Sequence, residues 1–202
     1  FMAILEVCGF NDWLIEELRR WNCHEIVLIH PEKPSKKKTD RRDARKLADL
    51  LWLNRDRLAA GEPVHGLRRV HMVTQRERED RQLTALRKTL GQRRTRTLNK
   101  IHRILNRHNQ MWDYPTKTFQ TQRGRRWLKT LELPEMDRLE MDMLLQEWNT
   151  WEEQIARVDA KIVERAQHQE EGEVVNATQI LMTAPGVSHY SGLTLASRIG
   201  PI

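Results

Sequence analysis

Met2-Ala3-Ile4-Leu5-Glu6-Val7-Cys8 and Glu25-Ile26-Val27-Leu28-Ile29-His30 are the two short apolar stretches that decide how the first part of the chain is interpreted. Both have the length and the apolar, β-branched composition of a buried strand. Between them, residues 11 to about 21 have the spacing of an amphipathic helix. The order strand, helix, strand predicts a β-α-β unit, and therefore an α/β fold for residues 1–60.

A further helix is predicted over residues 39–53, and its apolar side should pack on the sheet. The positions that follow the i, i+3, i+4, i+7 spacing are Ala44, Leu47, Ala48 and Leu51. Asp40 and Asp43 lie one turn apart on this same side. Burying ionised carboxylates is costly, and a divalent cation is the partner that suits two of them. The alternative is that Asp40 caps the helix and Asp43 favours its positive first turn.

Glu6 is an acid inside an apolar strand, on the same face as Ile4 and Cys8. An isolated glutamate of this kind can simply face water from an edge strand. Together with Asp40 and Asp43, however, it matches the layout of a two-metal nuclease core, in which carboxylates hold two Mg²⁺ ions about 3.5 to 4 Å apart.

Two long helices are predicted in the second part of the chain, over residues 68–175. Residues 68–108 contain 13 Lys or Arg and 3 Asp or Glu, with an apolar stripe that includes Leu83, Leu86 and Leu90. Residues 132–175 contain 13 acids and 4 bases, and Trp148, Trp151, Ile155, Val158 and Ile162 follow the 3,4 spacing of a coiled coil. We expect these helices to pair antiparallel as a long helical coiled coil, with residues 109–134 as the linker.

Charge favours nucleic acid as the partner, because the chain carries a net charge of +7. Arginine and lysine supply sequence-independent affinity for phosphate. The candidate contacts are Lys36, Lys37, Lys38, Arg93, Arg94, Arg96, Lys100 and Arg103. The alternative for the basic helix is a solvated face.

Two features bear on location. Cys8 and Cys23 are not spaced as metal ligands, and we interpret them as reduced thiols. No apolar run approaches the roughly 20 residues that span a bilayer. We therefore expect a cytoplasmic protein without a membrane partner.

Several motifs resemble a known family. They are Leu5-Glu6-Val7-Cys8-Gly9, Val27-Leu28-Ile29-His30-Pro31, Lys38-Thr39-Asp40-Arg41-Arg42-Asp43-Ala44-Arg45-Lys46-Leu47-Ala48, Gly124-Arg125-Arg126-Trp127-Leu128 with Leu133-Pro134, and Leu181-Met182-Thr183-Ala184-Pro185-Gly186-Val187. Together they resemble the DEDD insertion-sequence transposases, the bridge-RNA-guided recombinases of the insertion-sequence-110 type.

The resemblance implies a fold and a metal site. Residues 1–60 would be a partial RNase H-like (RuvC-like) domain, and residues 179–202 the start of a helical C-terminal transposase domain. Glu6, Asp40 and Asp43 would be the second, third and fourth acids of a catalytic, Mg²⁺-binding tetrad. Pro185-Gly186-Val187 resembles a helix-hairpin-helix turn, with a plain glycine turn between helices as the alternative.

The resemblance also implies a function. The family's first aspartate would lie upstream of position 1 and its nucleophilic serine beyond position 202, so we expect a chain truncated at both ends and inactive by itself. The leading hypothesis is a fragment of a transposase for DNA recombination, with DNA and a guide RNA as partners and with self-association through the long helices. The alternative is a non-catalytic nucleic-acid-binding remnant of a decayed element.

Overall fold

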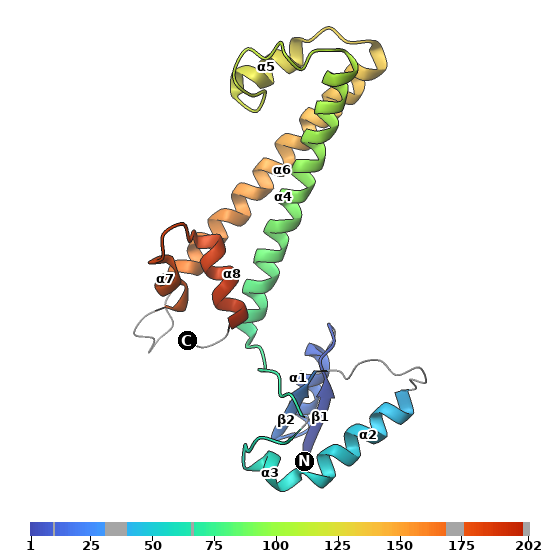
Figure 1. Ribbon diagram of the computed structural model, residues 1–202, viewed down its shortest axis with the longest axis vertical. Coiled ribbons are helices and arrows are strands. Elements are labelled where there is room, and N and C mark those ends of the chain that lie inside the picture. The colour runs from blue at the N-terminus through green and yellow to red at the C-terminus, as the bar shows by residue number, and fades with distance from the viewer. Residues whose placement is uncertain (10, 31–39, 66, 169–175, 200–202) are drawn as a thin grey trace. The chain divides into compact units, whose positions relative to one another are not determined.

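Two parallel strands, β1 (Met2–Glu6) and β2 (Glu25–Ile29), form the sheet of the first part of the chain, in the register Met2 opposite Glu25. They are joined by α1 (Asp12–Arg20), so the predicted β-α-β unit is present (Figure 1). The computed structural model describes residues 1–9, 11–30, 40–65, 67–168 and 176–199. It divides into two compact units, residues 1–73 and residues 74–202, which are described separately.

In the first unit, α2 (Asp40–Leu53) packs its apolar side on the sheet, and a short α3 (Arg55–Ala59) follows. Leu47, Leu50 and Leu51 of α2 contact the buried cluster of Val27, Ile29 and Leu58. The predicted packing of α2 is therefore confirmed at Leu47 and Leu51, whereas Ala44 and Ala48 are exposed.

The RNase H-like (RuvC-like) α/β fold expected for residues 1–60 is wrong. In the part of the chain that the structure describes, the sheet has two strands. The only further strand pairing there is an isolated antiparallel bridge between Ile29 and Arg69. The reason is that a β-α-β pattern specifies one parallel pair with its crossover helix and does not determine how many strands lie beside it. Most of the other described residues have helical periodicity and fold as helices.

The second unit is built on two long helices, α4 (Gln75–Arg107) and α6 (Glu135–Gln167), which run antiparallel (Figure 1). A capping box at Thr74 and Glu77 begins α4, and α6 begins directly after Pro134. Ion pairs join the two helices in antiparallel order, because residues near the start of α4 pair with residues near the end of α6. The pairs are Asp80–Arg165, Arg87–Asp159, Arg94–Glu152 and Arg107–Asp137.

The core of the second unit lies where the chain passes from α4 to α6. Leu98, Ile101 and Leu105 of α4 pack there against Leu144 and Trp148 of α6. The buried ring of Phe119 makes an edge contact with Trp148, at 5.9 Å between ring centroids. The connection between the long helices, including α5 (Gln122–Thr130), is thus folded back onto the helix pair.

Two short helices, α7 (Ala177–Met182) and α8 (His189–Ile199), pack at the opposite end of the pair. Arg81 of α4 donates from Nε to the Ser197 carbonyl at 2.6 Å, and Gly192 of α8 is buried beside Met182 and Thr178. These contacts place residues 177–199 in the same compact unit as the long helices.

Candidate nucleic-acid interface

The three acids predicted to bind metal lie in the first unit, at the end of β1 and in the first turn of α2. Asp40 is exposed, whereas Asp43 is half-buried and has one carboxylate oxygen, Oδ2, that is buried without a hydrogen-bond partner. Among the described residues, no three His, Cys, Asp or Glu side chains are grouped so that they could hold a metal ion. Glu6, Asp40 and Asp43 are accordingly not grouped in this way in the described part of the chain.

The predicted phosphate contacts Lys36, Lys37 and Lys38 lie outside the described residues. The other predicted contacts are on α4, within the most basic stretch of the chain. Residues 81–131 contain 14 Lys or Arg and a single acid, Asp113. They include most of α4, the connection that follows it and all of α5.

Two of the predicted bases contact other side chains of the second unit. Arg94 lies with Nε 3.3 Å from Glu152 Oε1, and it also donates from Nη2 to Gln120 Oε1 at 3.0 Å. The Arg93 guanidinium lies over the Trp151 ring, 5.3 Å from its centroid. Arg94 therefore tethers the connection to the helix pair.

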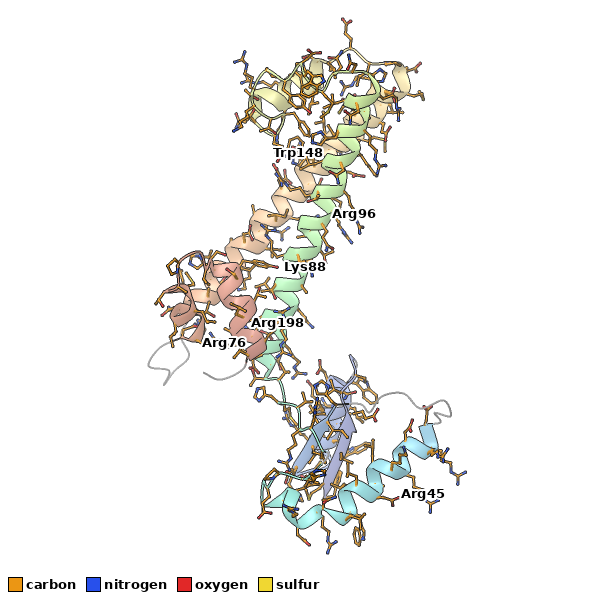
Figure 2. The ribbon with its side chains drawn as sticks, viewed as in Figure 1. Arg45, Arg76, Lys88, Arg96, Trp148 and Arg198 are labelled. Carbon is orange, nitrogen blue, oxygen red and sulfur yellow. The ribbon has the colours of Figure 1, made fainter. Side chains whose placement is uncertain are left out.

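The remaining three bases, Arg96, Lys100 and Arg103, are exposed and form what we call the basic row of α4. Their spacing of four and three residues puts them on one face of the helix, over a rise of about 10 Å. Within the described chain none of them makes an ion pair, and α4 contains no acid after Asp80. Figure 2 shows Arg96 projecting from this part of α4. Three cations thus face solvent without an ion-pair partner among the described residues.

A second set of exposed bases, which the sequence reasoning missed, lies on α5. Arg123, Arg126 and Lys129 recur every third residue and are all exposed. The signal was visible in the sequence, because residues 122–130 contain four bases, no acid and the spacing of one helix face.

The inner side of α5 explains why these bases point outward. Thr121 caps the helix by accepting from the Gly124 amide at 3.0 Å. Arg125 pairs with Glu152, and its guanidinium lies 3.7 Å from the centroid of the Trp148 ring. With Arg125 and Leu128 facing the core, the other three bases of α5 face water.

Glu152 is the acid that neutralises the inner bases. It accepts hydrogen bonds from Arg94, Arg125 and the Trp148 indole Nε1, the last at 2.8 Å. Burial raises the pKa of Glu152, but the hydrogen bonds from Arg125 and Trp148 and the positive charge of Arg125 outweigh burial, so the pKa is lower than its ordinary value. The inner bases are thus paired with an ionised carboxylate, whereas in the described part of the chain the outer bases have no ion pair.

Four of the seven tryptophans are largely exposed. Trp13, Trp21 and Trp52 in the first unit are 64%, 65% and 69% exposed, and Trp112 is 89% exposed. Trp112 lies five residues after the end of α4, in a tight turn in which the Asp113 amide donates to the Gln110 carbonyl. The ring of Trp112 is therefore presented to solvent close to the end of the basic part of α4.

Comparison of the chain with protein-family models, with curated proteins and with solved structures found no match in any of the three. Within the described parts of the chain, none of the helices combines the length and the apolar character needed to cross a bilayer.

Proposed function

We propose that this chain binds the phosphate backbone of nucleic acid through the basic row of α4, Arg96, Lys100 and Arg103, with the exposed bases of α5 as further contacts. The observation that carries the proposal is the separation of charge within the second unit. Inner bases such as Arg94 and Arg125 are paired with Glu152, whereas the basic row has no ion-pair partner among the described residues.

Binding of this kind is electrostatic and independent of sequence. Each base that neutralises a phosphate releases condensed counterions, so affinity falls as salt rises. The rise of about 10 Å along the basic row is long enough for its members to reach different phosphates of one strand. Trp112 adds an exposed ring on which an unpaired base could stack.

We propose DNA recombination as the process that this binding serves, with DNA and a guide RNA as the nucleic acids and the cytoplasm as the location. This part of the proposal is supported by the sequence resemblance alone, through residues 38–48 and 181–187. A non-catalytic role in nucleic-acid binding is the alternative. We also propose that the chain associates with itself through its long helices.

Fluorescence anisotropy with labelled single-stranded RNA, single-stranded DNA and duplex DNA tests the binding proposal. The Arg96→Ala/Lys100→Ala/Arg103→Ala variant should bind all three at least about tenfold more weakly at low salt. The matched control is Arg41→Ala/Arg42→Ala/Arg45→Ala, which removes the same charge from exposed positions of α2. Equal losses in the two variants would show a response to net charge alone and would overturn the assignment to α4.

A further inference from the structure

The outer face of α6 carries a stripe that no other described element covers. Its members recur at intervals of three or four residues, on the side of the helix away from the core residue Trp148. We call this set the outer stripe: Met136, Leu139, Met143, Gln146, Thr150, Gln154, Arg157 and Lys161. Met136, Leu139 and Met143 are 65%, 55% and 60% exposed, which is unusual for three neighbouring apolar side chains on one helix face.

The two ends of the outer stripe differ in chemistry. The first half is apolar and is flanked by the exposed acids Glu135 and Glu140. The second half ends in the exposed bases Arg157 and Lys161, of which Lys161 pairs with Glu164 at 2.6 Å. A helix with an apolar, acidic end and a basic end is complementary to a copy of itself running in the opposite direction.

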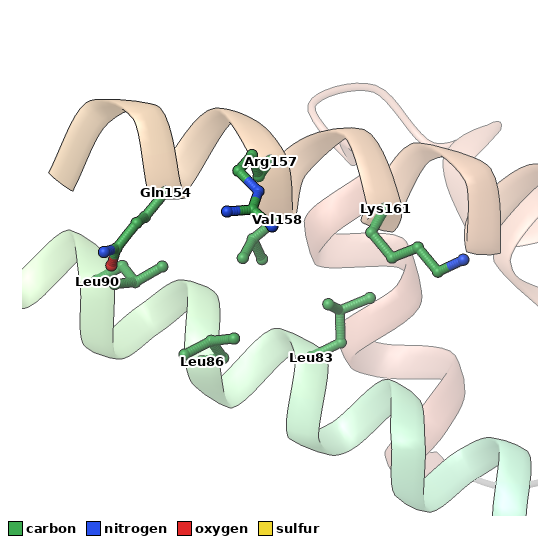
Figure 3. A pocket seen from close by; sticks show the side chains of 7 residues that line it. All are labelled: Leu83, Leu86, Leu90, Gln154, Arg157, Val158 and Lys161. Atoms are coloured by element: carbon green, nitrogen blue, oxygen red, sulfur yellow. The ribbon is translucent and has the colours of Figure 1, made fainter. Parts of the chain in front are cut away.

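An apolar groove lies beside the basic end of the stripe, between α4 and α6 (Figure 3). It has a volume of about 340 Å³, and Leu83, Leu86 and Leu90 form its α4 side. Val158 lies on its α6 side, and Arg157 and Lys161 form its basic rim. Leu86 was predicted to belong to the apolar stripe of α4, yet it is 48% exposed in this groove. The groove therefore has apolar walls and a basic rim, which suit an apolar helix face flanked by acids.

We propose that a second copy of this chain occupies the groove, with its α6 antiparallel to this α6 along the outer stripe. A two-fold axis at the level of Trp148 and Asn149 places Met143 opposite the partner's Gln154 and Leu139 beside the partner's Val158. The same register places Glu140 opposite the partner's Arg157. The inference rests on the self-association proposed above and does not require nucleic-acid binding.

The two-fold symmetry limits the assembly to a dimer in which both grooves are covered. Each methionine-containing half fills the groove of the other copy, so both grooves are covered by one isologous contact. The stripe from Met136 to Lys161 rises about 38 Å, which is long enough for a helix-pair interface. A parallel pairing would place Glu140 against Glu140 and Arg157 against Arg157, and it would leave both grooves open, so charge selects the antiparallel register.

Reversing the charges of the Glu140–Arg157 contact tests the register. Sedimentation equilibrium of the full chain should show a monomer–dimer equilibrium. Glu140→Arg alone and Arg157→Glu alone should each weaken the dimer at least about tenfold, since both place like charges opposite each other. The double variant Glu140→Arg/Arg157→Glu should restore dimerisation, because it exchanges the charges and keeps their pairing.

Lys88→Glu serves as the control, because it reverses an exposed base on α4 that is not in the groove or the stripe. It should leave the dimer unchanged, and circular dichroism of every variant should show unchanged helix content. A monomer at all concentrations, or a dimer that the single reversals do not weaken or the double variant does not restore, overturns the proposal. This outcome is independent of nucleic-acid binding, which is tested by the basic-row variant. If the chain binds nucleic acid but does not dimerise, only the dimer proposal is rejected.

Discussion

Gly124 is the residue at which the connection between the long helices is least tolerant of substitution. A Cβ at this position would lie 2.5 Å from Phe119 Cα and 2.6 Å from the Phe119 carbonyl carbon. Both are backbone atoms of a residue whose ring is fully buried, so neither can move aside. Close approach of α5 to residue 119 therefore requires glycine.

We predict that Gly124→Ala lowers the free energy of unfolding by about 1 to 3 kcal/mol, the usual cost of overpacking. Urea denaturation followed by circular dichroism measures it. Gly91→Ala is the matched control, because its Cβ would meet only the end of the flexible Arg87 side chain, at 3.3 Å. That substitution should raise stability by about 0.5 to 1 kcal/mol through helix propensity. Equal effects of the two changes would refute the packing account of Gly124.

At the scale of the elements, Glu152 joins α6 to α4 and α5 through Arg94 and Arg125. Its pKa is lower in the folded chain than its ordinary value, despite burial, because Arg125 and Trp148 donate hydrogen bonds to it. A lowered folded-state pKa contributes stability that is present above the unfolded-state pKa and is lost as pH falls through the folded-state pKa. The contribution of Glu152 should therefore be complete at neutral pH and disappear in acid.

We predict that Glu152→Gln is less stable than the parent chain at pH 7 by about 1 kcal/mol, a modest effect because the side chain is 34% exposed. The difference should shrink as the pH is lowered below the ordinary glutamate pKa of about 4.3. Urea titrations across this range, with the exposed neighbour Glu153→Gln as control, measure it. A difference that is constant with pH would contradict the role of the ionised carboxylate.

Periodicity was a good guide to the elements and a poor guide to the fold. The 3.6-residue spacing predicted α2 closely and the presence of α4 and α6, since long amphipathic patterns admit one interpretation, but both long helices are shorter than the stretches 68–108 and 132–175 from which they were predicted. The short α3 was missed, because five residues carry too little pattern. The RNase H-like fold was wrong because it came from resemblance and not from strand signals in this chain, whose described sheet has two strands.

The positive charge of the candidate interface was predictable from the sequence, but the identity of its paired and exposed bases was not. The sequence shows that residues 81–131 are basic, but it does not show which bases are paired. Arg94 and Arg96 are the same residue type in the same helix. Only Arg94 of the two reaches Glu152, because their side chains point to different sides of α4. Exposure of Trp112 was also hidden, since it depends on how the turn after α4 presents the ring.

At the scale of the whole molecule, the net charge of +7 is unevenly distributed. The basic stretch 81–131 is followed by α6, which has nine acids and four bases. Acids of α6 such as Asp137, Glu152 and Asp159 neutralise the inner bases of α4 and α5. What remains toward solvent is a positive surface on a rigid helix, which suits phosphate binding better than an isolated flexible tail would, since less freedom is lost on binding.

The salt dependence of nucleic-acid binding is the most direct test of this account. The logarithm of the association constant should fall linearly with the logarithm of salt concentration. Arg96→Ala/Lys100→Ala/Arg103→Ala should make that slope shallower by roughly 2 to 3, the amount expected for three lost phosphate contacts, while Arg41→Ala/Arg42→Ala/Arg45→Ala leaves it unchanged. A slope that is the same in the parent chain and in the α4 variant would contradict the claim that the basic row contacts phosphate.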